Sequence, residues 1–434
     1  MPPDHCRGTV EYIKNTITSD DFINKHKTSP SDFTKKRKLP FHVLLLLLIN
    51  LLRSSLQNEL DIFFKQIKND DMQKKEVTAS ALCQARRKLK HGAFIELSHG
   101  IVDHFYSNFR FKTWNGFRLL AADGSTIKVP RNQECSEHFG ALVPRQGESC
   151  PMARVSQCFD VLNHITIDSI IESRSVGERE LARRHFEHIK SGDLVLLDRG
   201  YPAFWLFSLI LNAKADFCAR IPVNRWTIVK RFVASGLSEQ VIDVESSTES
   251  KKKCAELGLS TTPLKLRLIR IDIKGSEEPA ILITSLIDSS LYSIEIFYKL
   301  YHQRWPVEEN YKILKSRIEI ENFTGKNVEA VLQDFYARTF ICNLTSILAF
   351  DVHEVISEKY KESKHSYKIN WTQAFAKMRN FGILLFFREN ILQVIKSLQE
   401  IFSENVSAVR DGRKFPRKHK VSKKIFAMPY KPIS

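Results

Sequence analysis

The segment Leu194-Val195-Leu196-Leu197-Asp198-Arg199-Gly200 is a short apolar run that ends on an acid, a base and a glycine. Four apolar residues bounded in this way fit a buried strand of a mixed sheet. Short or alternating apolar runs predict four further strands, at 117–129, 155–162, 165–171 and 217–221. Helices are predicted between them, at 177–190 and 202–214. Strands that alternate with helices in this order indicate an α/β domain.

Helical patterns predominate before residue 110. The apolar block Val43–Leu52 predicts a buried helix. A second helix is predicted from Thr78, which can cap it, to Lys90, with Gly92 ending it. The face opposite its apolar stripe carries four basic residues, Arg86, Arg87, Lys88 and Lys90. Such a face either contacts DNA phosphates or is simply solvated, and this segment alone does not decide between the two.

Two later regions depart from the alternating pattern. Residues 223–288 contain runs in which apolar and charged residues alternate, which predicts a β-rich insertion with antiparallel strands. Helical periodicity returns at Tyr292, and the best-marked helix begins after Asn327, which can cap it. The tail from Arg410 is strongly basic, and such an end on a basic chain favours contacts with phosphates.

The composition excludes several classes of protein. A chain of 434 residues with 43% hydrophobic and 26% charged residues is globular rather than disordered or fibrous. The formal net charge of +17 indicates a polyanionic partner, of which nucleic acid is the commonest. The most apolar run reaches only about half a bilayer span, so no membrane segment is expected. The first ten residues include Asp4, His5 and Arg7, so no signal peptide is expected. Eight scattered cysteines without a Cys-x-x-Cys pair favour reduced thiols in a cytoplasm.

Three acidic residues occupy positions at which they could bind metal ions and take part in catalysis. Asp123 and Asp198 each follow an apolar strand, and acids at the carboxyl ends of strands point into the crevice where open α/β sheets bind ligands. Glu308 lies in a predicted helix. Carboxylate oxygens suit Mg²⁺ or Mn²⁺, and two such ions about 4 Å apart can serve phosphoryl transfer. Each acid also has an ordinary reading as a turn or ion-pair residue, and spacing alone leaves three rivals open, Asp160, Asp193 and Glu309.

The sequence around Glu308 adds three residues to this pattern. On an uninterrupted helix, the four residues Tyr301, Arg304, Glu308 and Lys315 would share one face. Pro306 disfavours an uninterrupted helix, and a helix that begins there would leave only Glu308 and Lys315 aligned. An acid beside cations suits a metal ligand next to phosphate-binding groups, but an amphipathic helix with ion pairs would look the same.

The spacing of these four residues is similar to the signature of a known family. Their spacing, Tyr, two residues, Arg, three residues, Glu, six residues, Lys, resembles the Y-R-E-K signature of bacterial insertion-sequence DDE transposases, over most of the chain from Val77 to Arg413. In that family the first two acids end strands as Asp123 and Asp198 do here. The resemblance implies that Asp123, Asp198 and Glu308 are catalytic and hold two Mg²⁺ or Mn²⁺ ions. It also implies a ribonuclease H-like mixed-sheet core interrupted by the β-rich insertion.

The resemblance also implies an activity and partners. The expected activity is cut-and-paste transposition: strand cleavage at the element ends, then attack of the freed 3′-hydroxyl on target DNA. The expected partners are double-stranded DNA, as terminal inverted repeats and target, and a second copy of the chain in a synaptic complex, in the cytoplasm at the nucleoid. By this resemblance, Tyr301, Arg304 and Lys315 are expected to contact DNA phosphates. The basic helix face adds two candidate DNA contacts, Arg86 and Arg87.

The expected organisation has five parts. They are a helical N-terminal DNA-binding region (1–112), the first part of the catalytic core (113–222), the insertion (223–290), the second part of the core with the third acid (291–350) and a helical C-terminal region with a basic tail (351–434). Two alternative functions stay open. The chain could be a catalytically inactive DNA-binding regulator derived from a transposase, or a metal-dependent nuclease that cuts without joining.

Overall fold

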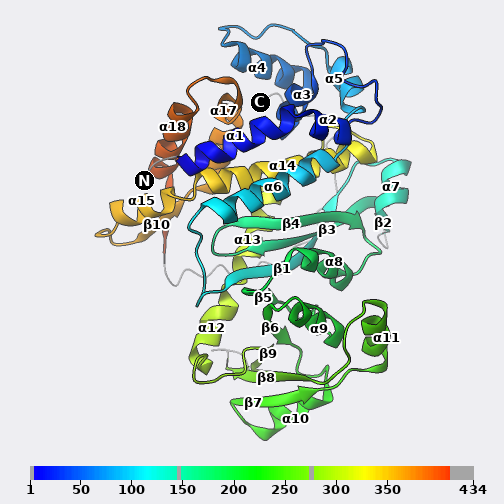
Figure 1. The fold of residues 1–434 in the computed structure, drawn as a ribbon, viewed down its shortest axis with the longest axis vertical. Helices are drawn as coiled ribbons and strands as arrows, with labels where there is room; N and C mark the ends of the chain where they lie inside the picture. The colour runs from blue at the N-terminus through cyan, green and yellow to red at the C-terminus, as the bar shows by residue number, and fades with distance from the viewer. Residues whose placement is uncertain (1–3, 144–147, 273–277, 411–434) are drawn as a thin grey trace. The chain divides into compact units, whose positions relative to one another are not determined.

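The computed structural model describes residues 4–143, 148–272 and 278–410, so most of the predicted basic tail lies outside the described residues. The chain divides into two compact units (Figure 1). The sheet unit comprises Phe111–Thr126 and Ala153–Lys312, and the helical unit comprises Met1–Arg110, Ile127–Met152 and Ile313–Ser434. Each unit is therefore assembled from segments that are distant in the sequence.

The sheet unit is organised around one mixed sheet. Its strands run in the order β3-β1-β5-β6-β9-β8-β7, and β4 also pairs with β3. The strand bounds are β1 (Arg118–Lys128), β3 (Cys150–Asp160), β4 (Ile165–Ser173), β5 (Asp193–Leu197), β6 (Asp216–Ile221), β7 (Glu239–Val244), β8 (Leu264–Ile271) and β9 (Ala280–Thr284). All the strands predicted from the sequence are confirmed.

The direction of the strands changes across the sheet. β1, β5 and β6 are parallel, whereas β3 and β4 form an antiparallel hairpin. A hairpin beside the first strand, followed by two parallel strands, is the arrangement that a ribonuclease H-like core implies. On the other side, β9 pairs antiparallel with β6, and β8 and β7 follow antiparallel. The strands of segment 223–290 thus extend this sheet.

Helices complete the sheet unit. Its helices are α8 (Glu178–His185), α9 (Phe204–Asn212), α10 (Thr227–Ser235), α11 (Thr248–Glu256), α12 (Ile294–His302) and most of α13 (Trp305–Ser316). α9 is apolar on nearly all sides and therefore buried, and its Phe207 ring stacks on Phe217 of β6 with the centroids 4.1 Å apart. Helices α10 and α11 interrupt the segment that the sequence predicted as β-rich.

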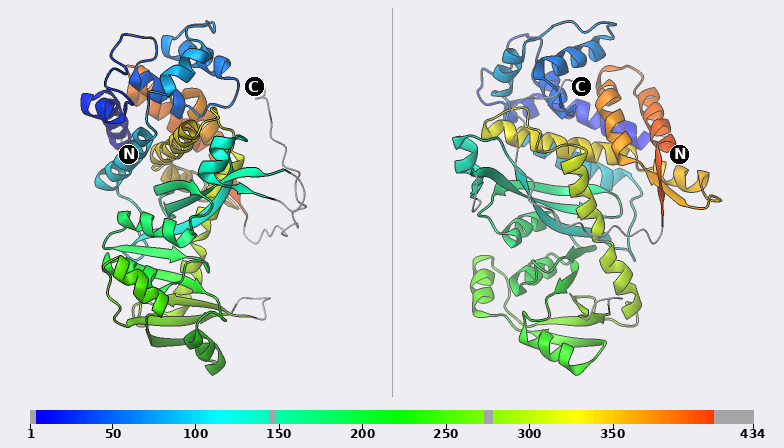
Figure 2. Two further views of the ribbon diagram at one scale, coloured as in Figure 1. Left: turned by 90° about the vertical axis from the view of Figure 1, so that its right-hand side faces the viewer. Right: turned by 180° about the vertical axis from the view of Figure 1, so that it is seen from behind.

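The helical unit is built around α14 (Val328–Leu348). Eighteen of its 21 residues are buried, as expected for the central helix of a bundle. The predicted cap is confirmed, because the Asn327 side chain accepts a hydrogen bond from the backbone N–H of Ala330 at 2.8 Å. Helices from both ends of the chain surround α14 (Figure 2). These are α1 (Asp4–Thr18), α3 (Phe41–Ile49), α6 (Gly92–Asn108), α16 (Trp371–Phe381) and α18 (Ile391–Glu404).

Smaller elements fill the rest of the helical unit. They are α2 (Asp20–His26), α4 (Leu56–Lys68), α5 (Ala79–Arg86), α7 (Gln133–Phe139), β2 (Ala141–Leu142), α15 (Val352–Lys359), β10 (Ser366–Ile369), α17 (Leu384–Phe387) and β11 (Val406–Val409). The prediction for α5 was right about its cap, Thr78, but wrong about its end. The helix stops at Arg86, and Gly92 starts α6 instead of ending α5.

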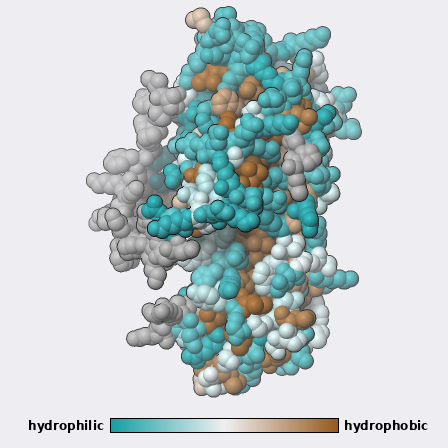
Figure 3. Space-filling model, turned by 90° about the vertical axis from the view of Figure 1, so that its left-hand side faces the viewer, coloured by the Kyte–Doolittle hydropathy of each residue, from teal (hydrophilic) through white to brown (hydrophobic). Residues whose placement is uncertain are grey.

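Hydrophilic side chains cover most of the face shown in Figure 3, with apolar ones in smaller groups. Within the described parts of the chain, no single helix has the length and apolarity to cross a membrane. Helices α14 and α15 meet at a bend of 49°. Taken together, they match a membrane span in length and composition only.

Candidate active site

The parallel strands β1 and β5 place the first two acids side by side. Ala122 of β1 is paired with Leu197 of β5, so the residues that follow, Asp123 and Asp198, are neighbours at the same edge of the sheet. Burial changes at this point, because the strand residues before each acid are buried and both acids are partly exposed. Asp198 follows the end of β5 as expected, whereas β1 continues beyond Asp123 to Lys128, so Asp123 lies where the buried half of β1 gives way to its partly exposed half.

The third acid comes from the junction of α12 and α13. α12 ends at His302 and α13 begins at Trp305, which confirms the predicted interruption near Pro306. Proline is tolerated in a first helical turn because its missing N–H would have no partner there. Glu308 lies in this first turn, and Arg304 lies between the two helices with its side chain only 6% exposed.

Arg304 and Tyr301 connect the three acids. The Arg304 guanidinium donates to Glu308 Oε1, and its Nη1 lies 3.9 Å from Asp123 Oδ2. The Tyr301 hydroxyl donates to Asp198 Oδ1 at 3.3 Å. The structure therefore brings together Asp123, Asp198, Glu308, Tyr301 and Arg304, all within the sheet unit.

Burial and neighbouring charges shift the pKa values of the groups in this cluster. Burial raises the pKa of Asp123 to about 6; Arg304 opposes this shift, and Glu308 and Asp198 add to it. Burial also raises the pKa of Tyr301, with Asp198 contributing. For Arg304, burial disfavours the charged form, but Tyr301 and the acids outweigh it and raise its pKa.

This donor set fits a divalent cation. Carboxylates from three separate chain segments converge, and hard oxygen ligands of this kind suit Mg²⁺ or Mn²⁺. Burial raises the pKa of Asp123 and so disfavours its charged form, and the nearby Glu308 and Asp198 add to this shift. A bound cation would oppose this shift.

A buried hydrogen-bond chain supports the peptide of Asp123. Its carbonyl oxygen accepts from the Tyr311 hydroxyl at 2.8 Å and from Ser156 Oγ at 3.3 Å. Ser156 Oγ lies 2.9 Å from His185 Nε2, and His185 Nδ1 lies 2.6 Å from Asp168 Oδ2. This Ser-His-Asp order resembles that of a hydrolase triad, but Ser156 and His185 are both 0% exposed. No substrate can reach them, so the chain has a supporting role.

Two side chains of α13 fasten the helix that carries Glu308. Tyr311 reaches the backbone of β1, as described above, and Asn310 Nδ2 donates to Gln157 Oε1 of β3 at 3.0 Å. Neither residue stands out in the sequence as a candidate for the site. Their positions, two and three residues after Glu308, are the only signal that could have suggested them.

Two arginines near the acids were also missed. Ala219 of β6 is paired with Leu197, which places Arg220 beside Asp198. Burial lowers the pKa of Arg220, and the charge of Arg199 contributes. Arg199 itself is exposed. Arginines beside acids at a sheet edge are suited to bind phosphate oxygens.

The remaining predicted DNA contacts lie in the helical unit. Lys315 is near the end of α13, two turns after Glu308 and on the same face of that helix. Arg87, the C-cap of α5, is exposed.

Arg86 is buried, so the prediction that its side chain faces DNA is wrong. It is 7% exposed, and its Nη2 lies 2.6 Å from Asp334 Oδ1. Further bonds reach Thr324 and the carbonyl of Ala330. The guanidinium is therefore neutralised inside the helical unit, where it joins α5 to α14.

Comparisons with known proteins concern the part of the chain that carries this site. The family model described as "Transposase DDE domain" matches residues 114–344, a range that includes all three acids. The chain is 24% identical over 275 residues to the transposase InsG for insertion sequence element IS4 of Escherichia coli (strain K12), covering 62% of this chain and 60% of the relative. It is 29% identical over 165 residues to the putative transposase y4zB of Sinorhizobium fredii, covering 37% of this chain and 44% of the relative.

The chain thus matches less than two thirds of the length of either curated relative. Among solved structures, a piggyBac transposase in a synaptic complex with hairpin DNA gives a TM-score of 0.46 at 10% identity, covering 91% of this chain and 85% of that one. Because the family model spans more than half of its residues, the chain belongs to the family of transposases with a DDE domain.

Proposed function

We propose that this protein is a DNA transposase that moves an insertion sequence by metal-dependent cleavage at the element ends and 3′-hydroxyl transfer into target DNA. The observation that carries the proposal is the convergence of Asp123, Asp198 and Glu308 around Arg304. We also assign the Y-R-E-K signature to this chain, with Tyr301, Arg304, Glu308 and Lys315 as its members.

In this proposal the three carboxylates hold two divalent ions, Mg²⁺ or Mn²⁺. When bound, such ions activate the attacking oxygen and stabilise the leaving one. Asp123 acts from the middle of β1, Asp198 acts from the end of β5, and Glu308 acts from a helix that Tyr311 and Asn310 fasten to the sheet. This attachment supports the cluster because catalytic groups must be held in place before the substrate arrives.

The cations of the site would position the DNA. Arg304 is buried, and its Nε and Nη1 atoms have no hydrogen-bond partner in the described structure. A phosphate oxygen would satisfy these donors, because arginine presents paired N–H groups that match phosphate geometry. Arg220 and Arg199 would contact adjacent phosphates. The proposed partners are double-stranded element ends, target DNA and a second copy of the chain in a synaptic complex.

The test uses the purified protein with DNA that flanks its own gene, in Mg²⁺ and in EDTA, with cuts and joined products mapped. We expect metal-dependent cuts at the element ends and joining to a second DNA. Glu308→Gln and Asp198→Ala should abolish cleavage while DNA binding persists. Glu309→Gln is the matched control, because Glu309 is exposed and paired with Lys312 on the same helix.

Other outcomes would contradict the proposal. Binding without cuts would identify an inactive regulator, and cuts without joining would identify a nuclease. Cleavage at a normal rate by Asp198→Ala would remove the second acid from the assignment.

A further inference from the structure

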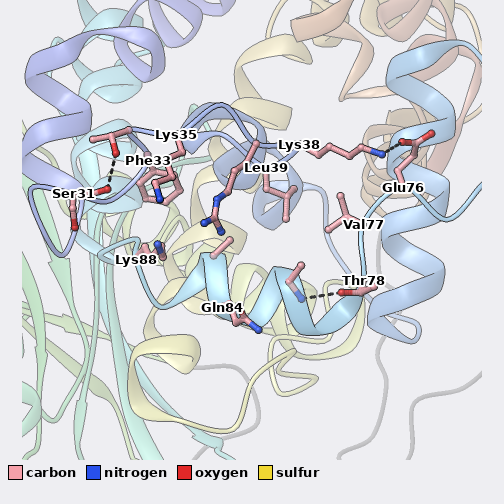
Figure 4. Close-up of a pocket in the computed structure, with 14 residues that line it drawn as sticks. Ser31, Phe33, Lys35, Lys38, Leu39, Glu76, Val77, Thr78, Gln84 and Lys88 are labelled. Atoms are coloured by element: carbon pink, nitrogen blue, oxygen red, sulfur yellow. Dashed lines mark hydrogen bonds and ion pairs between the residues drawn. The ribbon is translucent and has the colours of Figure 1, made fainter.

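A second concave site lies within the helical unit. Figure 4 shows a cavity between residues 31–39, which connect α2 to α3, and residues 76–88, which lead into and form α5. Its volume is about 730 Å³, within the range of roughly 300–1,000 Å³ typical of sites for one small ligand. The two walls are joined by the bridge between Lys27 and Leu89 and by an ion pair between Lys38 and Glu76.

The charge of the cavity is strongly positive. Four cations, Lys35, Arg37, Lys38 and Lys88, line it against one carboxylate, Glu76. Lys38 Nζ lies 2.7 Å from Glu76, and Lys88 Nζ lies 3.0 Å from Asp32, so these two charges are largely compensated. Lys35 and Arg37 are exposed, and among the residues described no ion pair involves either of them. Two cations therefore remain available to an anion.

An aromatic ring stands beside these cations. Phe33 lines the cavity, and its ring packs edge-on against Phe41 with the centroids 5.3 Å apart. Its backbone φ of 60° is unusual for a bulky residue and costs energy, which identifies a constrained position. The buried side chains of Leu39 and Val77 provide further apolar lining. Cations next to an aromatic face are the features with which proteins bind unpaired nucleotides.

We propose that this cavity binds one unpaired nucleotide of a DNA strand, with its phosphate at Lys35 and Arg37 and its base against Phe33. A single nucleotide fits the volume of the cavity, whereas a duplex does not fit inside it. The identification of DNA as the source rests on the proposed function. The site uses none of the three acids, so it can be tested without cleavage.

The experiment measures binding of the full chain to fluorescein-labelled (dT)8 by anisotropy, in EDTA and at several salt concentrations. We expect Lys35→Ala/Arg37→Ala to weaken binding about tenfold and to reduce the slope of log affinity against log salt by about 0.7 for each lost phosphate contact. The matched control is Lys36→Ala/Lys75→Ala. It removes the same charge at two exposed positions that do not line the cavity, Lys36 between the two tested cations and Lys75 just before the second wall. It should change the affinity by less than about twofold.

A second variant tests the base. Phe33→Leu should weaken binding of (dT)8 at least about fivefold, yet leave an abasic oligonucleotide of equal length unaffected. Competition distinguishes a nucleotide site from a site for free phosphate. We expect dTMP to displace (dT)8, whereas inorganic phosphate alone should not displace it. The proposal is overturned if both double variants lose equal affinity, if the abasic and normal strands bind the unmodified protein equally, or if phosphate competes as well as dTMP. A failure of cleavage would leave all of these measurements interpretable.

Discussion

At the scale of single residues, Asp123 links the site to pH. Its pKa in the folded protein is raised to about 6, mainly by burial, above the ordinary value of 3.8. The protonated form is therefore favoured by folding, and the stability that it contributes is complete below about pH 4 and lost as the pH rises through 6. Asn resembles the protonated acid, so Asp123→Asn should stabilise the metal-free protein at pH 8 by roughly 1–3 kcal/mol. Urea unfolding in EDTA at pH 4 and pH 8 measures this difference.

The comparison between the two pH values is the control. At pH 4 the wild-type carboxyl is already almost fully protonated in the folded protein, where its pKa is about 6, so the variant should gain little. An equal gain at both values would show that the effect comes from packing and not from the charge of Asp123.

At the scale of elements, the attachment of α13 to β1 depends on Tyr311. Tyr311→Phe removes the 2.8 Å hydrogen bond to the Asp123 carbonyl and keeps the ring, so stability should fall by about 1 kcal/mol. If the bond also positions the acids, the affinity for Mn²⁺ measured by calorimetry should fall several-fold. Tyr298→Phe is the control, because Tyr298 of α12 is 51% exposed. Unchanged Mn²⁺ affinity in Tyr311→Phe would limit this residue to packing.

The elements also show how far the sequence can be interpreted. Local patterns predicted β5, the apolar helix α9 and the caps Thr78 and Asn327, because each depends on a few consecutive residues. Arg86 was misinterpreted because its partner, Asp334, lies 248 positions away in the sequence. Helical spacing places a side chain on a face but does not say what covers that face.

The same limit applies to the candidate site. The spacing from Tyr301 to Lys315 indicated the third acid, and the strand ends indicated the first two. The hydrogen bonds that support Asp123 could not be predicted, since Ser156, His185 and Asp168 come from separate elements and no spacing rule connects them.

At the scale of the whole molecule, neither unit is a continuous piece of chain. The helical unit requires residues before Arg110 and after Ile313, and α14 packs against α3 and α6 from the N-terminal part. A fragment of residues 111–434 should therefore expose the apolar surface of α14. We expect this fragment to aggregate or to bind a hydrophobic dye, as measured by size-exclusion chromatography and dye fluorescence. A monomeric fragment that unfolds cooperatively would contradict this prediction.

The sealed position of Ser156 has a consequence for activity profiling. A search of structures for the geometry of serine hydrolases would select the arrangement of Ser156, His185 and Asp168. Fluorophosphonate reagents, which label reactive serines, should nevertheless leave the native protein unmodified, because Ser156 has no accessible surface. A structural search would thus wrongly select this protein as a serine hydrolase, whereas chemical labelling would correctly exclude it.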